Sequence, residues 1–511
     1  MFKMIPLPSF VRSEESRSGW WLWLARLDWQ ATAVFILPFV LYWLTLAPTI
    51  YNLDSAEFTT AVASNGIIRA TGYPLYLLVG KVWSWLPLSS DMGYRMNLFS
   101  AFLGAITLLQ AEYILRRLQV EPWLRLGALG LLATAPYFWA MSLIAEVYTL
   151  HTALLAGIIL SLLRWADAPT LLRLVLPICL MTLSLGNHMA TVLLVPGAVW
   201  FVLTSHPASF KNWRVWAAAG TAVLLGLTVF LVLPLRYASQ PLFNYAGEYD
   251  AAGVFHPVNL MSFSGFWWLI TGQSFAGQMF GYQLNEVWPQ MAAYGAQLWT
   301  AFLAIGIGPG LLGLVVLMRR NWRLGGLLLL IFLANAIFYI NYRVIDKDTM
   351  YLPTYLIWAI WLGVGYQQLA LWLQSQVQPQ LSPWLLRGVA LGAVLLAVGL
   401  NWSLVDRSAD WSTREMAETI LAEVEPNALV LGWWDTVPAV QYLQLVEGQR
   451  PDVQTINRFL IPGAAMEELI LSQLDTRPIY INNPSMTLLQ QATAVPVGPV
   501  YKLERRLEPM P

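Results

Sequence analysis

Residues 30–47 read QATAVFILPFVLYWLTLA, and residues 48–58 continue as PTIYNLDSAEF. The first stretch carries no charge, and a helix needs about 20 apolar residues to cross the hydrocarbon core of a bilayer. The second stretch carries two carboxylates, Asp54 and Glu57, soon after the apolar run ends. The chain is therefore expected to cross a membrane here and to present acidic groups at the surface where it emerges.

The composition of the whole chain agrees with this prediction. Of its 511 residues, 57% are hydrophobic and 11% are charged, and the mean hydropathy is +0.55. In soluble proteins roughly a quarter of the residues are charged. The 26 Trp and 21 Tyr residues suit the interfacial belts of a membrane protein. We predict a polytopic α-helical membrane protein, and the net charge of zero indicates no nucleic-acid partner.

Apolar segments recur along the chain and predict about eleven spanning helices. Several segments are short, and their ends are uncertain by a few residues. They lie at about 30–47, 96–115, 125–143, 147–163, 172–186, 190–204, 215–234, 291–317, 324–341, 352–373 and 385–404.

The Lys and Arg residues near the helix ends predict the orientation, because cytoplasmic loops are enriched in both. With the N-terminus inside, an odd number of spans places the C-terminus outside. We expect a multi-pass protein of the cell (inner or plasma) membrane. Its inner loops then collect Arg12, Arg17, Arg26, Arg116, Arg117, Arg125, Arg164, Arg173, Lys211, Arg214, Arg319, Arg320, Arg323 and Arg387.

This topology divides the chain into a cytoplasmic segment (1–29), a transmembrane domain (30–404) and an extracytoplasmic domain (405–511). The outer loop 48–94 is amphipathic, so its helices are expected to lie along the membrane surface. The outer loop 236–290 is rich in Gly and aromatic residues. The tail alternates helical and apolar strand patterns, which predicts a small α/β domain with a mostly parallel sheet. Its expected helices are 410–424, 436–447 and 463–474, and its expected strands are 428–433, 452–457 and 478–482.

Asp54 and Glu57 allow two interpretations. An Asp at the start of a helix with Glu three residues later matches a capping box, which satisfies open backbone N–H groups. A carboxylate at a lipid–water boundary could instead deprotonate an acceptor hydroxyl. The spacing leaves both interpretations open, and one residue can do both.

Several basic residues fall on the outer side, where they do not contribute to orientation. Each one alone suits a surface salt bridge. As a group they would suit an anionic ligand, since Arg offers two parallel donors to a phosphate. The set is Arg69, Lys81, Arg95, Arg236, Arg343 and Lys347.

Other polar residues at the outer helix ends are further candidates. Trp433 and Trp434 lie at a strand-to-helix turn of the tail, where they could stack on a sugar or pack the domain against the outer loops. A divalent metal held by some of Asp54, Glu57, His188 and Asp346 stays open, although no ligand spacing supports it. The remaining candidates are Glu146, Tyr148, His151, Asn187, Asp348 and Tyr351.

Short motifs together indicate a family. They resemble those of bacterial membrane proteins related to the eukaryotic transmembrane protein O-mannosyltransferases, within the GT-C glycosyltransferase superfamily. The resemblance runs from about residue 30 into the tail. In chain order the motifs are Leu53-Asp54-Ser55-Ala56-Glu57-Phe58, Thr71-Gly72-Tyr73-Pro74-Leu75-Tyr76, Arg95-Met96-Asn97-Leu98-Phe99-Ser100-Ala101, Ala145-Glu146-Val147-Tyr148-Thr149-Leu150-His151, Leu185-Gly186-Asn187-His188, Pro234-Leu235-Arg236, Tyr351-Leu352-Pro353-Thr354-Tyr355 and Arg450-Pro451-Asp452-Val453.

The resemblance implies a GT-C type fold and inverting transfer of a sugar from a polyprenyl-phosphate donor to a hydroxyl of a protein, glycan or lipid. In such enzymes an acidic residue of the first outer loop is the base, so Asp54 inherits that role and Glu57 a supporting one. Arg69 stands where the family pattern has His, and it could bind the phosphate. The substrate-binding residues expected are Arg69, Tyr73, Arg95, Asn97, Glu146, Tyr148, His188, Arg236, Arg343, Tyr351, Trp433 and Trp434.

Within this set, Arg236 and Arg343 are expected to stabilise charge on the leaving phosphate. Two other classes of protein remain open, namely a transporter or lipid flippase and a non-catalytic assembly protein. Transporters often carry charged residues within their helices and repeated halves. Here the ionisable residues gather at one face, which favours chemistry at the membrane surface.

Overall fold

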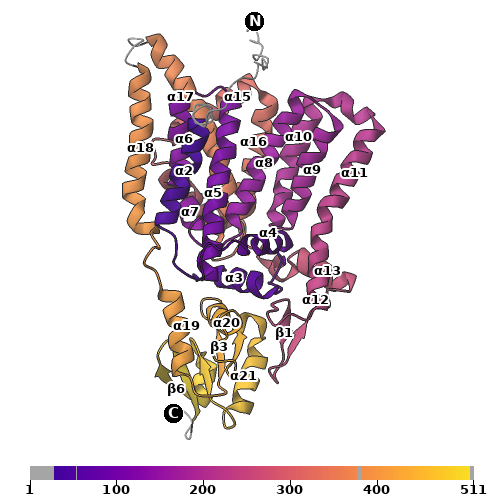
Figure 1. Cartoon of the computed structure of the whole chain (residues 1–511), viewed down its shortest axis with the longest axis vertical. Coiled ribbons are helices and arrows are strands. Elements are labelled where there is room, and N and C mark those ends of the chain that lie inside the picture. Colours follow the sequence, from indigo (N-terminus) through magenta and orange to yellow (C-terminus); the bar gives the residue numbers. More distant parts are fainter. Residues whose placement is uncertain (1–27, 53, 377–381, 507–511) are drawn as a thin grey trace, which may run out of the picture.

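The computed structural model describes residues 28–52, 54–376 and 382–506. A bundle of long helices makes up most of the molecule, and a smaller α/β domain lies beyond one end of it (Figure 1). Short helices and a two-stranded sheet form a layer between these two parts (Figure 1). The predicted cytoplasmic segment 1–29 lies almost entirely outside the described residues.

The bundle helices follow the predicted spans, and the protein is a multi-pass membrane protein. Six helical stretches of the described residues are long and apolar enough to cross a bilayer, and shorter apolar helices accompany them. The exact number of crossings stays a prediction. The bundle consists of α2 (Trp29–Leu44), α5 (Met92–Arg117), α6 (Pro122–Ala133), α7 (Pro136–Met141), α8 (Tyr148–Asp167), α9 (Leu171–Leu185), η1 (Met189–Leu194), α10 (Val195–Ser205), η2 (Pro207–Lys211), α11 (Trp213–Leu227), η3 (Thr228–Leu231), α14 (Leu284–Ala301), α15 (Ile307–Arg320), α16 (Trp322–Ile340), α17 (Leu352–Gln376) and α18 (Ser382–Val405).

Two of the predicted spans are not single helices. The segment 125–143 is divided into α6 and α7, because Pro136 begins α7 and has no backbone N–H to continue the preceding helix. The segment 291–317 is broken between α14 and α15, where Leu303 and Ala304 have positive φ. Hydropathy does not reveal this second break, because the residues of the turn are as apolar as the helices on either side.

Helices α15 and α17 pack at close range through glycine. A Cβ atom built on Gly313 would lie 1.7 Å from the carbonyl oxygen of Trp361, and one built on Gly365 would lie 1.8 Å from that of Pro309. Lipid tails are as apolar as the side chains, so close backbone packing replaces the hydrophobic effect as the force that joins spanning helices. The two glycines permit that packing.

The layer between the bundle and the tail begins with α3 (Ser55–Ser64) and α4 (Pro74–Ser84). Both lie across the end of the bundle and are not among its long helices (Figure 1), and their position at the membrane surface stays a prediction. Residues 55–62 of α3 are all buried. Helix α3 packs against α4, α5 and the tail helix α20 (Val437–Leu445), so protein covers it. The layer also contains α12 (Val232–Ala238), β1 (Gly247–Tyr249), β2 (Phe255–Pro257), α13 (Phe263–Ile270), η4 (Gln273–Gln278) and η5 (Lys347–Tyr351).

The tail contains a five-stranded sheet in the order β4-β3-β5-β7-β6. Strand β3 pairs in parallel with β4 and β5, and Val430 lies opposite Thr455 and Tyr480. The prediction of a mostly parallel sheet is incomplete, because β7 and β6 add an antiparallel hairpin. Pro496 lies in the edge strand β6, and such a proline makes a strand resemble a loop in the sequence. The tail elements are α19 (Ser412–Glu423), β3 (Leu429–Gly432), α20, β4 (Gln454–Asn457), η6 (Arg458–Leu460), α21 (Gly463–Gln473), β5 (Ile479–Ile481), α22 (Met486–Gln491), β6 (Ala492–Val497) and β7 (Val500–Arg505).

Polar contacts also join the tail to the layer. The guanidinium of Arg414 in α19 lies 3.3 Å from Asp91, the residue that caps α5, and 2.7 Å from Glu447. Tyr245 of the 236–290 loop donates a hydrogen bond to Gln441 of α20. These contacts hold the tail over the layer in which α3 is buried.

Candidate active site

Asp54 and Arg69 form an ion pair at the start of α3. One guanidinium nitrogen of Arg69 lies 2.6 Å from Oδ1 and 2.8 Å from Oδ2 of Asp54. The Asp54 side chain makes no hydrogen bond to the backbone of α3, so the capping-box interpretation is wrong. The chain after α3 turns back and places Arg69 near the start of the helix. The Asp54 carboxylate binds this guanidinium instead of capping the backbone N–H groups of α3.

Glu57 lies one turn further along α3 and shares the same arginine. Its Oε1 accepts a hydrogen bond from the backbone N–H of Arg69 at 3.2 Å, and its Oε2 lies 3.4 Å from the guanidinium. Only 2% of the Glu57 side chain is exposed. Burial raises the pKa of Glu57 to about 8, although Arg69 lowers it in part and Asp54 adds repulsion. Burial opposes the charge on Arg69, yet Asp54 and Glu57 together raise its pKa above the ordinary value.

The tail domain covers this group of charges. The Trp434 ring lies 3.8 Å from the guanidinium carbon of Arg69, a cation–π distance, and Phe275 lies 5.9 Å from it. Trp434 also meets Tyr245 at 5.3 Å, edge to face. The prediction that Trp434 packs against the outer loops is therefore confirmed by its contacts, and its ring faces the candidate site.

Two more acids, Glu146 and Asp346, interact electrostatically with Asp54 and Arg69. Glu146 precedes α8 and Asp346 precedes η5, so they come from loops far apart in the sequence. Burial raises the pKa of both groups above the usual range, and repulsion from Asp54 adds to the effect. Glu146 is 3% exposed, and its Oε2 has no hydrogen-bond partner among the described residues. The site therefore brings Asp54, Glu57, Glu146 and Asp346 within electrostatic reach of one arginine, Arg69.

Aromatic and imidazole rings form the wall behind the acids. The ring of His188 lies 6.2 Å from that of Tyr73, 6.0 Å from that of Tyr148 and 5.2 Å from that of His151. Burial lowers the pKa of His188 to about 4, so it is neutral at physiological pH, and its Nδ1 accepts a hydrogen bond from the backbone N–H of Ala190. The structure thus brings Tyr73, Tyr148 and His188 together, as their motifs suggested.

The other predicted substrate-binding residues have structural contacts of their own. Asn97 donates to the carbonyl groups of Ala47 and Thr49 and accepts from Ala145, so it fastens two loops together. Tyr351 stacks on Tyr294 at 4.4 Å, and Trp433 lies 4.4 Å from the Arg458 guanidinium. Among the described residues, none of these contacts involves Asp54 or Arg69.

The basic residues predicted to lie on the outer side have hydrogen-bond acceptors within the protein. Apart from Arg69, they donate hydrogen bonds to backbone or amide carbonyl groups. The acceptors are Ala63 for Lys81, Ser84 for Arg95, Gly66 for Arg236, Gly281 for Arg343 and the side chain of Gln290 for Lys347. Arg343 also lies 3.8 Å from Glu286. Neither Arg236 nor Arg343 forms a hydrogen bond or ion pair with Asp54 among the described residues, so their role at a leaving phosphate stays a prediction.

No set of three His, Cys, Asp or Glu side chains in the described part of the chain is arranged to hold a metal ion. The set considered from the sequence, Asp54, Glu57, His188 and Asp346, therefore does not form a metal centre here. Asp346 was also expected from the sequence as a polar candidate at an outer helix end, next to Lys347 and Asp348.

Comparison with solved structures identifies the fold. The structure of ArnT from Cupriavidus metallidurans bound to undecaprenyl phosphate aligns over 94% of this chain and 97% of that chain, with a TM-score of 0.55 and 12% identity. The same protein in the apo state aligns equally well, at 13% identity. The chain has the GT-C fold.

Sequence comparison relates this chain to the O-mannosyltransferases. Residues 54–211 match the family described as "Protein O-mannosyl-transferase TMEM260 N-terminal domain", and the match begins at Asp54. Protein O-mannosyl-transferase tmem260 of Dictyostelium discoideum is 21% identical over 88% of this chain and 63% of that protein. TMEM260 of Mus musculus is 29% identical over 27% of this chain and 20% of that protein. The chain spans less than two thirds of the length of these relatives.

The raised pKa of Glu57 predicts a pH dependence of stability. Between the ordinary carboxyl pKa near 4.5 and about 8, folded Glu57 keeps a proton that the unfolded chain has lost. The free energy of unfolding should therefore fall as the pH rises through this window, by on the order of a few kcal/mol. Glu57→Gln has no group at this position that can lose a proton, so its free energy of unfolding should not show this fall. The stability of the variant relative to the wild type should therefore increase as the pH rises.

Thermal unfolding in detergent from pH 5 to pH 9 measures this effect. Glu248→Gln is the control, because Glu248 is an exposed carboxylate of strand β1. Parallel curves for the wild type and Glu57→Gln across the window would show that Glu57 is ionised in the folded protein.

Proposed function

We propose that this protein transfers a sugar, with inversion, from a polyprenyl-phosphate donor to a hydroxyl acceptor at the membrane surface. The observation that carries the proposal is the Asp54–Arg69 pair beneath Trp434 in a GT-C fold. It provides a carboxylate and a cation at the boundary of the bundle, where a lipid phosphate and a polar acceptor can meet. Relatives that bear the name of protein O-mannosyl-transferases support a protein hydroxyl as the acceptor.

In the proposed reaction Asp54 takes the proton of the acceptor hydroxyl. The hydroxyl oxygen attacks the anomeric carbon as the bond from that carbon to the phosphate oxygen breaks. The electron pair of the broken bond leaves with the polyprenyl phosphate, and the proton stays on Asp54 until water removes it. A single displacement inverts the anomeric carbon, so one base is sufficient. Glu57, with its raised pKa, is protonated at neutral pH and is unsuited to be the base.

Arg69 supplies the cation for the leaving phosphate. Both oxygens of Asp54 are occupied by the guanidinium, so an acceptor proton can reach them only after Arg69 has moved away. A donor phosphate offers oxygens that compete for the same guanidinium. Donor binding would thus release Asp54 and place Arg69 where negative charge grows in the transition state. The base becomes available only when a donor is present.

The tail domain has a supporting role in this proposal. Trp434 stacks on Arg69, and the covered site excludes water that would otherwise accept the sugar. We place the site on the outer face of the cell membrane with the N-terminus in the cytoplasm. The support is the set of basic residues at the opposite helix ends, among them Arg116 and Arg117 at the end of α5.

Direct assay tests the proposal. Purified protein in nanodiscs receives radiolabelled polyprenyl-phosphate mannose or other polyprenyl-phosphate sugars, together with Ser- and Thr-containing peptides and glycolipid acceptors. We expect transfer from at least one lipid-linked donor, and nuclear magnetic resonance of the product should show the inverted anomer. Nucleotide sugars serve as control donors. Absence of transfer from every lipid-linked donor, or equal transfer from nucleotide sugars, would contradict the proposal.

A further inference from the structure

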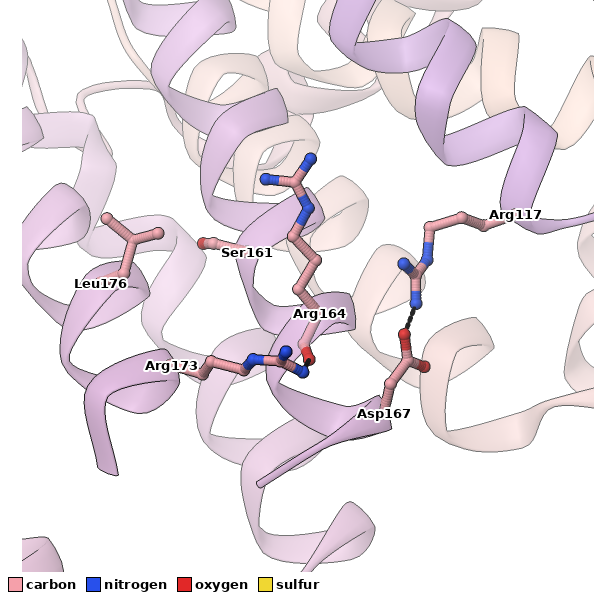
Figure 2. Close-up of a pocket in the computed structure, with 6 residues that line it drawn as sticks. All are labelled: Arg117, Ser161, Arg164, Asp167, Arg173 and Leu176. Atoms are coloured by element: carbon pink, nitrogen blue, oxygen red, sulfur yellow. Dashed lines mark hydrogen bonds and ion pairs between the residues drawn. The ribbon is translucent and has the colours of Figure 1, made fainter. Parts of the chain in front are cut away.

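A cavity of about 360 Å³ lies at the end of the bundle opposite the Asp54 site. Helix α8 connects the two places, because it begins at Tyr148 beside the candidate site and ends at Asp167 beside the cavity. A helix of 20 residues spans about 30 Å, which is the thickness of the hydrocarbon core. The cavity therefore faces the other leaflet. It is lined by Arg117, Ser161, Arg164, Asp167, Arg173 and Leu176 (Figure 2).

The lining is strongly cationic. Arg117 ends α5, Arg164 lies in the last turn of α8, and Arg173 lies in the first turn of α9. Asp167 is the one acid of the lining, and it pairs with Arg117 (Figure 2). Two of the three guanidinium charges are thus left without a carboxylate in the cavity.

Most guanidinium N–H groups of Arg164 and Arg173 have no acceptor among the described residues. Among the described residues, the guanidinium of Arg173 donates only to the backbone carbonyl of Arg164, at 3.4 Å. The guanidinium of Arg164 has no hydrogen bond or ion pair with the described residues, and Figure 2 shows it extended between Ser161 and Arg117. Each guanidinium carries five N–H donors in a fixed fork that fits phosphate oxygens.

The enrichment of Lys and Arg in cytoplasmic loops does not by itself explain why the arginines at the cavity lack acidic partners. Arg116 and Arg125 lie at the same end of the bundle, and both pair with Glu112, which is fully buried. Arg116 also pairs with Asp28. Those cations are compensated within the protein, whereas Arg164 and Arg173 line the cavity and form no ion pair with the described residues.

The surroundings of the cavity are apolar. Leu176 lines it with 48% of its surface exposed, and Leu172 on the same helix is 80% exposed. Both lie on the outside of a helix of the bundle, where acyl chains would contact them. A lipid can therefore place its headgroup in the cavity and its chains against α9, whereas a free phosphate would gain nothing from these leucines.

We propose that this cavity binds the phosphate headgroup of an anionic glycerophospholipid, in the leaflet opposite the Asp54 site. Arg164 and Arg173 donate to the phosphate oxygens, and Arg117 is held in place by Asp167. The site is independent of the proposed sugar transfer, since it shares no residue with it.

Native mass spectrometry and thermal unfolding test this site. The protein is purified in detergent and mixed with phosphatidylglycerol, with phosphatidylcholine as the neutral lipid. The wild type should retain phosphatidylglycerol and unfold at a higher temperature with it. Arg164→Gln/Arg173→Gln should weaken retention about 30-fold, the equivalent of ~2 kcal/mol for two cations near a lipid surface. Arg164→Gln alone removes no contact with the described residues, so it should fold as the wild type does and still lose part of the binding.

The control is Arg319→Gln/Arg323→Gln, which removes the same charge from the adjoining ends of α15 and α16 at the same end of the bundle. Equal loss in this control would show that general electrostatics, rather than the cavity, holds the lipid. Equal retention by the wild type and the Arg164→Gln/Arg173→Gln variant would overturn the proposal. Glycerol 3-phosphate is the soluble probe, and stabilisation by it as strong as by the lipid would assign the cavity to a free phosphate instead.

Discussion

Asp54→Asn should abolish sugar transfer while the protein stays folded. The substitution removes the proton acceptor but keeps an oxygen to which Arg69 can donate. A positioned general base contributes about 10²- to 10⁴-fold to a rate, so turnover should fall by that factor. Because Asp54 makes no capping hydrogen bond, the loss of a helix cap does not complicate the result. The measurement is turnover with a saturating lipid-linked donor, together with the unfolding temperature of each variant.

Glu248→Gln is the matched control for this experiment, since it removes an exposed carboxylate from strand β1 of the same layer. It should leave turnover unchanged. Near-normal turnover in Asp54→Asn would mean that Asp54 only positions Arg69. The base would then have to be sought among Asp346 and the other acids of the site.

Arg69→Gln should reduce both donor affinity and turnover, with the larger effect on turnover. Charge on the phosphate increases as the sugar leaves, so the guanidinium stabilises the transition state more than the bound donor. Removal of one such donor group costs about 10²- to 10³-fold in kcat. Arg69→Lys should restore only part of the rate, because a single ammonium cannot reproduce the planar fork or stack equally on Trp434.

Turnover and donor KM are measured for both variants, with Arg505→Gln as the control, because Arg505 is an exposed residue of strand β7 in the tail. If Arg69 exchanges Asp54 for the donor phosphate, its removal should also raise the donor KM. If Arg69 served only to hold Asp54, Arg69→Gln would leave donor KM unchanged, and that result would refute its role in phosphate binding.

The candidate site was only partly predictable from the sequence. Asp54 and Glu57 stand out as carboxylates in the loop after the first apolar segment, and Arg69 stands out as a cation on the predicted outer side. The capping box was the wrong interpretation because local spacing takes no account of a cation twelve or fifteen residues away. Arg236 was expected at a phosphate, yet it donates to the carbonyl of Gly66 after α3. The last carbonyl groups of a buried helix need hydrogen-bond donors from elsewhere in the protein, and the linear sequence does not show which side chain supplies them.

The sequence by itself determined the membrane class, the approximate spans, and the parallel part of the tail sheet, because apolar runs and their periodicity act over a few neighbouring residues. It also placed Asp54 at the end of the first span. Only the tertiary structure decided what surrounds that carboxylate. Arg69, Glu146, Asp346 and Trp434 come from four separate segments, and their approach depends on how the bundle, the layer and the tail pack together. Burial in that packing sets the protonation of Glu57, since the cost of a buried charge depends on the whole environment and not on neighbours in the chain.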